Sequence, residues 1–153
     1  MNNKKNNKGF SLVELIVVIA VMAVLVGVLA PAYLRYVDKA KLQKDVSAVG
    51  EVVEAIKIAA AEEAVYNEIY SATSGLDVTI TDGSPIAGGT KLATELNAVV
   101  GTIDFTSTAM NEKTVKIKVE KETNTYAVKI TVGGEGTTVT DPTAKENLGK
   151  LSE

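Results

Sequence analysis

A long apolar stretch near the start of the chain sets the strongest limit on what this sequence can fold into. Residues 10–30 read FSLVELIVVIAVMAVLVGVLA, and Glu14 is the only charged residue among these 21. As an α-helix the stretch is about 31 Å long, at about 1.5 Å per residue. That length matches the roughly 30 Å hydrocarbon core of a bilayer. We therefore predict a membrane-spanning helix over residues 10–30.

A cleaved secretory signal is the main alternative for this stretch. Such a signal has a shorter apolar core, followed by a cleavage site of the small-x-small type. Small residues do follow the stretch, as Ala30 and Ala32, but Pro31 between them is poorly placed for such a site. Both the length and the proline favour a spanning helix.

The lysine and arginine counts on the two sides of the stretch do not orient it in a membrane. Three such residues precede it and four closely follow it, so the positive-inside rule gives no clear direction. The residues concerned are Lys4, Lys5 and Lys8 before it, and Arg35, Lys39, Lys41 and Lys44 after it.

Glu14 is a costly residue for a membrane-spanning helix, because a charge in lipid requires a partner. One interpretation is that its side chain snorkels to the headgroups, since it lies one turn from the helix start. The other is that a cation compensates it. Further along, Pro31 removes the hydrogen bond to the carbonyl of Gly27, which predicts a kink at this turn.

The pattern after the stretch predicts that the helix continues over residues 31–70 as an amphipathic segment. Apolar residues recur there at spacings of three and four, which places them on one face. We therefore expect one helix of roughly 60 residues, kinked near Pro31. The residues of the stripe are Leu42, Val46, Val49, Val53, Ile56 and Ala60.

The remainder, residues 71–153, predicts a small α+β head. Alternating apolar residues indicate a short strand over residues 76–81 and an antiparallel hairpin over residues 114–132, which includes Tyr126. The buried face of this hairpin is expected to pack on the helical stripe. Residues 134–140, GEGTTVT, offer a possible third strand of that sheet.

Two short helices are predicted in the same region. Thr90 as N-cap and Gly101 as stop delimit a helix at about residues 90–100. Asp141 as N-cap, Pro142 at the first helical position and Gly149 as stop delimit a terminal helix. The predicted fold class is thus α+β, a long N-terminal helix packed on a small antiparallel sheet.

The composition excludes several kinds of chemistry. There is no cysteine and no histidine, which removes disulfides, thiolate nucleophiles, imidazole bases and Cys/His metal sites. Asp and Glu are scattered without the spacing of a calcium loop, and adjacent pairs such as Glu62 and Glu63 are read as solvated charge. We therefore expect no enzyme, cofactor or metal site. A net charge of −3 with no basic stripe beyond the first fifty residues gives no evidence of a nucleic-acid site.

The stretch KGFSLVELIVVIAVMAVLVGVLAPAYLRY resembles the N-terminus of type IV prepilins. It has a basic leader that ends in Gly9, then Phe10, a carboxylate four residues on at Glu14, and a long apolar helix. The resemblance implies that a prepilin peptidase cuts between Gly9 and Phe10 and methylates the new amine of Phe10. It also implies that Glu14 meets the N-terminal amine of a neighbouring subunit, and that the helix bends or unwinds near Pro31.

The same resemblance implies the topology and the partners. The leader, residues 1–9, stays cytoplasmic, and the head lies on the other side of the membrane. The implied partners are further copies of the chain in a helical filament, the membrane, the prepilin peptidase, an assembly platform and an ATPase motor. The precursor would reside in the inner or cytoplasmic membrane and the product in a cell-surface pilus. Many pilins pin their C-terminal loop with a disulfide; this chain has no cysteine, so another contact must hold that loop.

Three functions remain open from the sequence. The first is a structural pilin that polymerises through residues 10–30. The second is a minor pilin or a pseudopilin of a type II secretion or competence DNA-uptake machine, which shares the same processing residues. The third is a single-span anchored binding domain with an accidental motif match. Adhesion, twitching motility, secretion and DNA uptake are not distinguished by these residues.

Overall fold

The computed structural model describes residues 10–122 and 127–152, and the chain divides into two compact units between Val37 and Asp38. Helix α1 (Leu12–Ala59) contributes residues to both units. The predicted leader, residues 1–9, lies outside the described residues.

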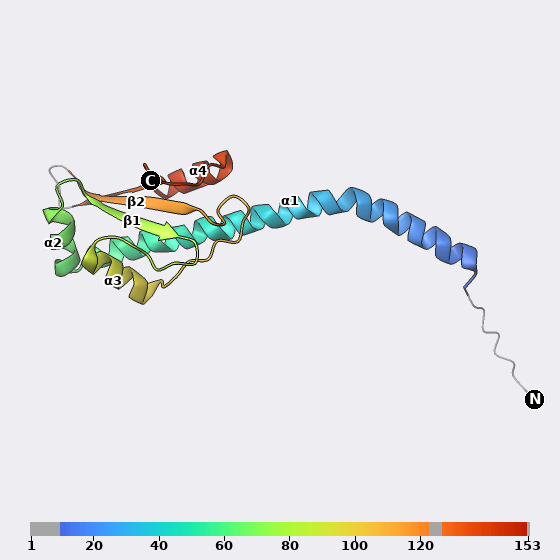
Figure 1. Cartoon of the computed structure of the whole chain (residues 1–153), viewed down its shortest axis with the longest axis horizontal. Coiled ribbons are helices and arrows are strands. Elements are labelled where there is room, and N and C mark those ends of the chain that lie inside the picture. The colour runs from blue at the N-terminus through green and yellow to red at the C-terminus, as the bar shows by residue number, and fades with distance from the viewer. Residues whose placement is uncertain (1–9, 123–126, 153) are drawn as a thin grey trace, which may run out of the picture. The chain divides into compact units, whose positions relative to one another are not determined.

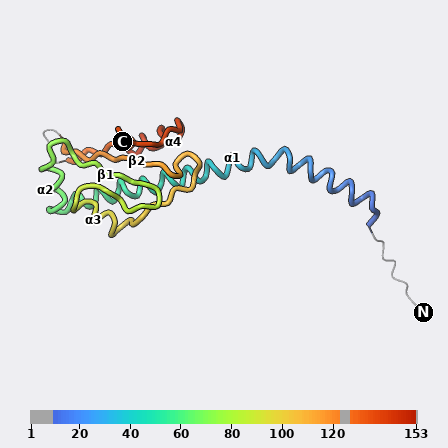
Figure 2. Tube along the Cα trace, viewed as in Figure 1, coloured from blue at the N-terminus to red at the C-terminus, as the bar shows by residue number. Residues whose placement is uncertain are grey.

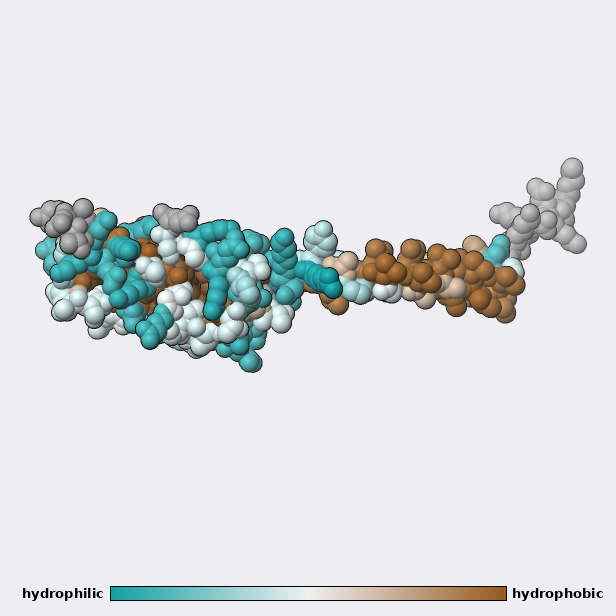
Figure 3. All heavy atoms as spheres, turned by 90° about the horizontal axis from the view of Figure 1, so that it is seen from above, coloured by the Kyte–Doolittle hydropathy of each residue, from teal (hydrophilic) through white to brown (hydrophobic). Residues whose placement is uncertain are grey.

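The first unit consists of the apolar part of α1. Every side chain from residue 10 to residue 36 is exposed in the isolated chain, and the space-filling view shows this part as a nearly continuous hydrophobic surface (Figure 3). Among the described residues, α1 is the one helix long and apolar enough to cross a membrane. The helix continues through Pro31 without interruption, so the kink expected at Gly27 and Pro31 stays a prediction.

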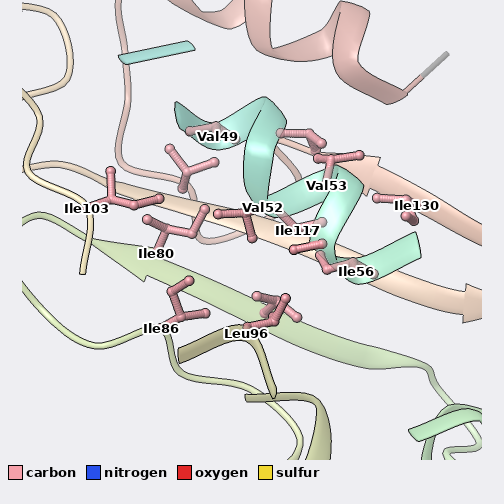
Figure 4. Packing of buried hydrophobic residues seen from close by; sticks show 14 of the residues in the cluster. Val49, Val52, Val53, Ile56, Ile80, Ile86, Leu96, Ile103, Ile117 and Ile130 are labelled. Atoms are coloured by element: carbon pink, nitrogen blue, oxygen red, sulfur yellow. The ribbon is translucent and has the colours of Figure 1, made fainter. Parts of the chain in front are cut away.

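The second unit starts with the remainder of α1, whose buried face confirms the predicted stripe. All six predicted stripe residues are buried, and this face packs against the sheet. Figure 4 shows Val49, Val52 and Ile56 of α1 beside Ile80 and Ile117 of the strands. The helix therefore supplies one wall of the core of the head.

The predicted continuation of the helix over residues 31–70 is wrong in part, because α1 ends at Ala59 and a separate helix α2 (Glu63–Ser71) follows. A tight turn joins them, in which the N–H of Glu62 donates to the carbonyl of Ala59 at 3.0 Å. If α1 continued with the spacing of its stripe, the polar side chain of Asn67 would face the core. The turn instead directs apolar residues of α2 toward the core. The buried residues of α2 are Val65 and Ile69.

The sheet has three antiparallel strands in the order β1-β2-β3. They are β1 (Leu76–Thr81), β2 (Thr114–Lys121) and β3 (Val128–Val132). The register pairs Val78 with Ile117 and Val119 with Ile130, so apolar residues share one face. The predicted strand and hairpin are confirmed; the predicted Tyr126 lies outside the described residues.

Residues 134–140 are not a strand, and the third strand is β1. Gly133 and Gly136 have φ angles of 81° and 87°, which turn the chain out of extended geometry. The segment still contacts the start of β2: the N–H of Thr138 donates to the carbonyl of Thr114 at 2.9 Å. Backbone and hydroxyl contacts thus replace a regular ladder there.

Helix α3 (Thr90–Val99) confirms the short helix predicted between β1 and β2, and Figure 2 shows the chain passing through it before it returns as β2. The predicted N-cap is wrong, since Gly89 occupies that position. The Glu68 carboxylate of α2 instead accepts from the N–H groups of Lys91 and Leu92, at 3.1 and 3.0 Å. A carboxylate near a helix N-terminus is also favoured by the helix dipole.

The terminal helix α4 (Pro142–Gly149) is also confirmed. The Asp141 carboxylate caps it by accepting from the N–H of Ala144 at 2.9 Å, and a short 3-10 helix, η1 (Lys150–Ser152), follows. The Ser152 hydroxyl accepts from the N–H of Val132 at 2.8 Å. Figure 1 shows α4 on the same side of the head as the C-terminus. These contacts hold the C-terminal segment on β3 without a disulfide.

Three aspartates hold the loop between α3 and β2. Buried Asp45 of α1 accepts from the N–H of Thr106 at 3.0 Å and from the N–H of Ser107 at 2.7 Å. Asp38, two turns earlier on α1, accepts from the N–H and the hydroxyl of Thr108, at 3.0 and 2.8 Å. Asp82 holds two further points of the loop by accepting from the N–H groups of Phe105 and Glu112.

Candidate functional site at the start of helix α1

The candidate site is the first turn of α1, where a capping box organises the backbone. Ser11 precedes the first helical residue, and its hydroxyl accepts from the N–H of Val13 at 3.3 Å. The Glu14 carboxylate reaches back and accepts from the N–H of Ser11 at 2.8 Å. These reciprocal bonds satisfy two of the N–H groups that have no partner within the helix.

The carboxylate of Glu14 is thereby held close to the predicted cleavage point. The nitrogen of Phe10 lies at most about 3.7 Å from the nitrogen of Ser11, given standard bond lengths. Because Glu14 Oε2 is 2.8 Å from the nitrogen of Ser11, the nitrogen of Phe10 lies within about 6.5 Å of that oxygen. Any cation created at Phe10 is therefore within electrostatic reach of the carboxylate of the same chain.

Of the predicted site residues that the structure describes, Phe10 and Glu14 lie near each other, whereas Gly27 and Pro31 lie apart from them. Phe10 is 90% exposed, so its ring makes no packing contact that would fix it in the isolated chain. Gly9 lies outside the described residues. Gly27 and Pro31 are on the same helix, three to five turns further on, and do not belong to the site.

Ser11 is the functional residue that the sequence analysis missed. The signal was present, since SLVE over residues 11–14 is the S-x-x-E pattern of a capping box. The structure also changes the interpretation of Glu14, which has a hydrogen-bonding partner in its own chain. Pairing with a neighbouring subunit must compete with that local bond.

The described residues do not form a candidate metal-binding site. They contain no group of three or more Asp or Glu side chains able to hold a metal ion. What the site offers is a single carboxylate on an apolar helix, beside a backbone segment that is exposed.

The fold has a pilin-like architecture, with an exposed apolar N-terminal helix, a carboxylate at its first turn, and a small α+β head. Comparison with known families agrees, since residues 4–30 match the prokaryotic N-terminal methylation motif. The chain therefore carries the prokaryotic N-terminal methylation motif on a fold with pilin-like architecture. The motif and the helix fit a membrane-anchored precursor.

One curated relative is similar to the chain over part of its length. Prepilin peptidase-dependent protein A of Clostridium perfringens (strain 13 / Type A) is 33% identical over 85 residues. The aligned region covers 54% of this chain and 58% of the relative, so the chain spans less than two thirds of that protein. No solved structure matches the chain.

Proposed function

We propose that the chain is a structural subunit of a type IV pilus. In this proposal a prepilin peptidase cuts between Gly9 and Phe10 and methylates the amine of Phe10, and the mature chains polymerise through their N-terminal helices. The assembly platform and its ATPase motor are the further partners, and the filament is displayed at the cell surface.

The observation that carries the proposal is the surface of α1 in the first unit. Apart from Glu14 the helix is apolar on all sides over residues 12–30, and none of these side chains is buried by the chain itself. A helix that is hydrophobic all round requires lipid or other helices as its surroundings. Lipid satisfies that requirement in the precursor, and the helices of neighbouring copies satisfy it in a filament.

Glu14 has a specific part in this proposal. Transfer from the membrane edge into a bundle of helices desolvates the carboxylate, and a buried charge without a partner is strongly destabilising. The amine of Phe10 on an adjacent copy supplies that partner. Because desolvation offsets much of the attraction, the pair selects the register of the incoming subunit more than it adds stability.

The proposal is tested by shearing surface filaments from cells and identifying their main component by mass spectrometry. We expect this chain as the principal protein, in its processed form. Filaments built mainly from another protein, with this chain in trace amounts, would support the minor pilin or pseudopilin instead. Recovery of the chain only in the membrane, unprocessed, would support the single-span binding domain.

A further inference from the structure

Two exposed apolar side chains of the second unit lie together in one groove. Within the described residues from 38 onward, the large apolar side chains that are exposed are Ile58 and Val99, each 74% exposed. Both line a groove of about 820 Å³ between α1, the end of α3 and η1, together with Val100 and Leu151. Figure 1 shows α3 alongside this part of α1.

Acidic side chains outnumber basic ones around this groove once the smaller pocket beside it, which shares Ile58 and Val99, is included. The two lysines of the groove are already paired, Lys57 with Glu54 at 2.8 Å and Lys150 with Glu146 at 3.0 Å. Three glutamates of this combined surface have no ion pair within the described part of the chain; the first lines the groove itself, and the other two line the smaller pocket. They are Glu51, Glu62 and Glu95.

The complementary surface is on the same chain, at the start of the second unit. Lys39, Lys41 and Lys44 are exposed on α1. The two acids of that segment, Asp38 and Asp45, are engaged by N–H groups of the loop at residues 106–108. The segment therefore presents cations to solvent, and the aliphatic stems of lysines readily cover apolar surface.

We propose that the groove around Ile58 and Val99 receives the Lys39–Lys44 segment of a second copy of this chain. The aliphatic stems cover the apolar floor, and the ammonium groups meet the acidic side chains around it. Exposed ion pairs contribute little each, so the charges define the register and the salt dependence of the contact. This inference rests on the proposed function, since it requires copies aligned in a filament.

The contact involves a different neighbour from the one that pairs with Glu14. The midpoints of the lysine segment and of the groove are separated along α1 by about 11 residues, or about 17 Å. Pairing Phe10 of one copy with Glu14 of another requires an offset of only four residues, about 6 Å. Each subunit would therefore recognise one neighbour through the helix start and a second through the groove.

A charge-swap experiment in full-length chains tests this inference. We expect Glu51→Lys/Glu95→Lys to lower the yield of sheared filaments by about five-fold or more, since two attractions become repulsions. Lys41→Glu/Lys44→Glu should have the same effect, and the four changes together should restore the yield. Asp77→Lys/Glu135→Lys, which reverses two exposed acids that line neither pocket, is the matched control and should leave the yield unchanged.

The outcomes separate this inference from the proposed function. If the wild-type chain yields filaments but the combined variant stays as defective as either parent, the groove contact is wrong and the pilin function stands. A defect from the lysine changes alone, with no effect of the glutamate changes, would indicate membrane headgroups and also overturn the contact. Absence of wild-type filaments would count against the proposed function itself. Processing to the mature N-terminus in each variant verifies that the chains are made and inserted.

Discussion

Asp45→Ala is the substitution for which the structure gives the clearest magnitude. Asp45 is 1% exposed, and its carboxylate accepts from the buried N–H of Ser107 and the partly buried N–H of Thr106. A hydrogen bond to a charged acceptor is worth about 1.5 to 3 kcal/mol, and a buried donor without a partner costs a similar amount. Water can reach the N–H of Thr106, so the loss of that hydrogen bond lowers the free energy of unfolding by less. The expected loss in the free energy of unfolding is about 2 to 4 kcal/mol.

Urea denaturation of the full-length protein in detergent, followed by circular dichroism, measures this loss. With a slope of about 1.5 kcal/mol per molar urea, the midpoint should fall by about 1.3 to 2.7 M. Asp104→Ala is the matched control, since Asp104 is an exposed residue of the same loop whose side chain makes no hydrogen bond within the described residues. The free energy of unfolding of Asp104→Ala should stay within about 0.5 kcal/mol of the wild-type value. A loss of the same small size for Asp45→Ala would refute the role assigned to this carboxylate.

Four further outcomes are expected. Gly9→Leu should leave a longer, unprocessed precursor in membrane fractions on immunoblots, and normal maturation would exclude the cut site. Glu14→Ala should be processed normally but assemble poorly, because the incoming amine loses its partner. Glu14→Gln keeps an acceptor for the capping box and removes only the charge, so it should assemble equally poorly; a normal filament yield from Glu14→Gln would reject the charge pair. The N–H of Thr108 is the main cause that lowers the pKa of Asp38, so the stability that Asp38 contributes should be present at neutral pH. This stability, measured as the difference between the urea midpoints of the wild type and Asp38→Asn, should be lost as the pH falls below about 4. A difference between these midpoints that does not change with pH would contradict the role of Asp38. Glu68→Ala should destabilise α3 by about 1 kcal/mol, seen as faster amide exchange in that helix; unchanged exchange would exclude the cap.

Much of the fold follows from periodicity. The apolar stripe of α1, the hairpin and both short helices were predictable because spacing is a local property of the sequence. The cap residue was predicted correctly only for α4, where Asp141 caps the helix; the N-cap position of α3 is Gly89. The break between α1 and α2 was missed, since no Gly or Pro marks it. The available signal was the change of phase between Ala60 and Val65, which places the next apolar residues on another face.

Contacts between distant residues could not be predicted in the same way. Glu68 caps a helix 23 residues later, and Asp45 binds a loop 61 residues away. Asp45 looks like an interruption of the apolar stripe until that loop is placed against it. In the site, Phe10 and Glu14 came from a motif, whereas the local bond between Ser11 and Glu14 was missed although the S-x-x-E pattern of residues 11–14 signals it.

The most direct test of the pilin assignment is the mass of the N-terminal peptide of this chain, recovered from cells that contain the prepilin peptidase. We predict a peptide that starts at Phe10 and carries one methyl group on its amine. A peptide that starts at Met1, or one produced by cleavage after Ala30 or Ala32, would contradict the assignment.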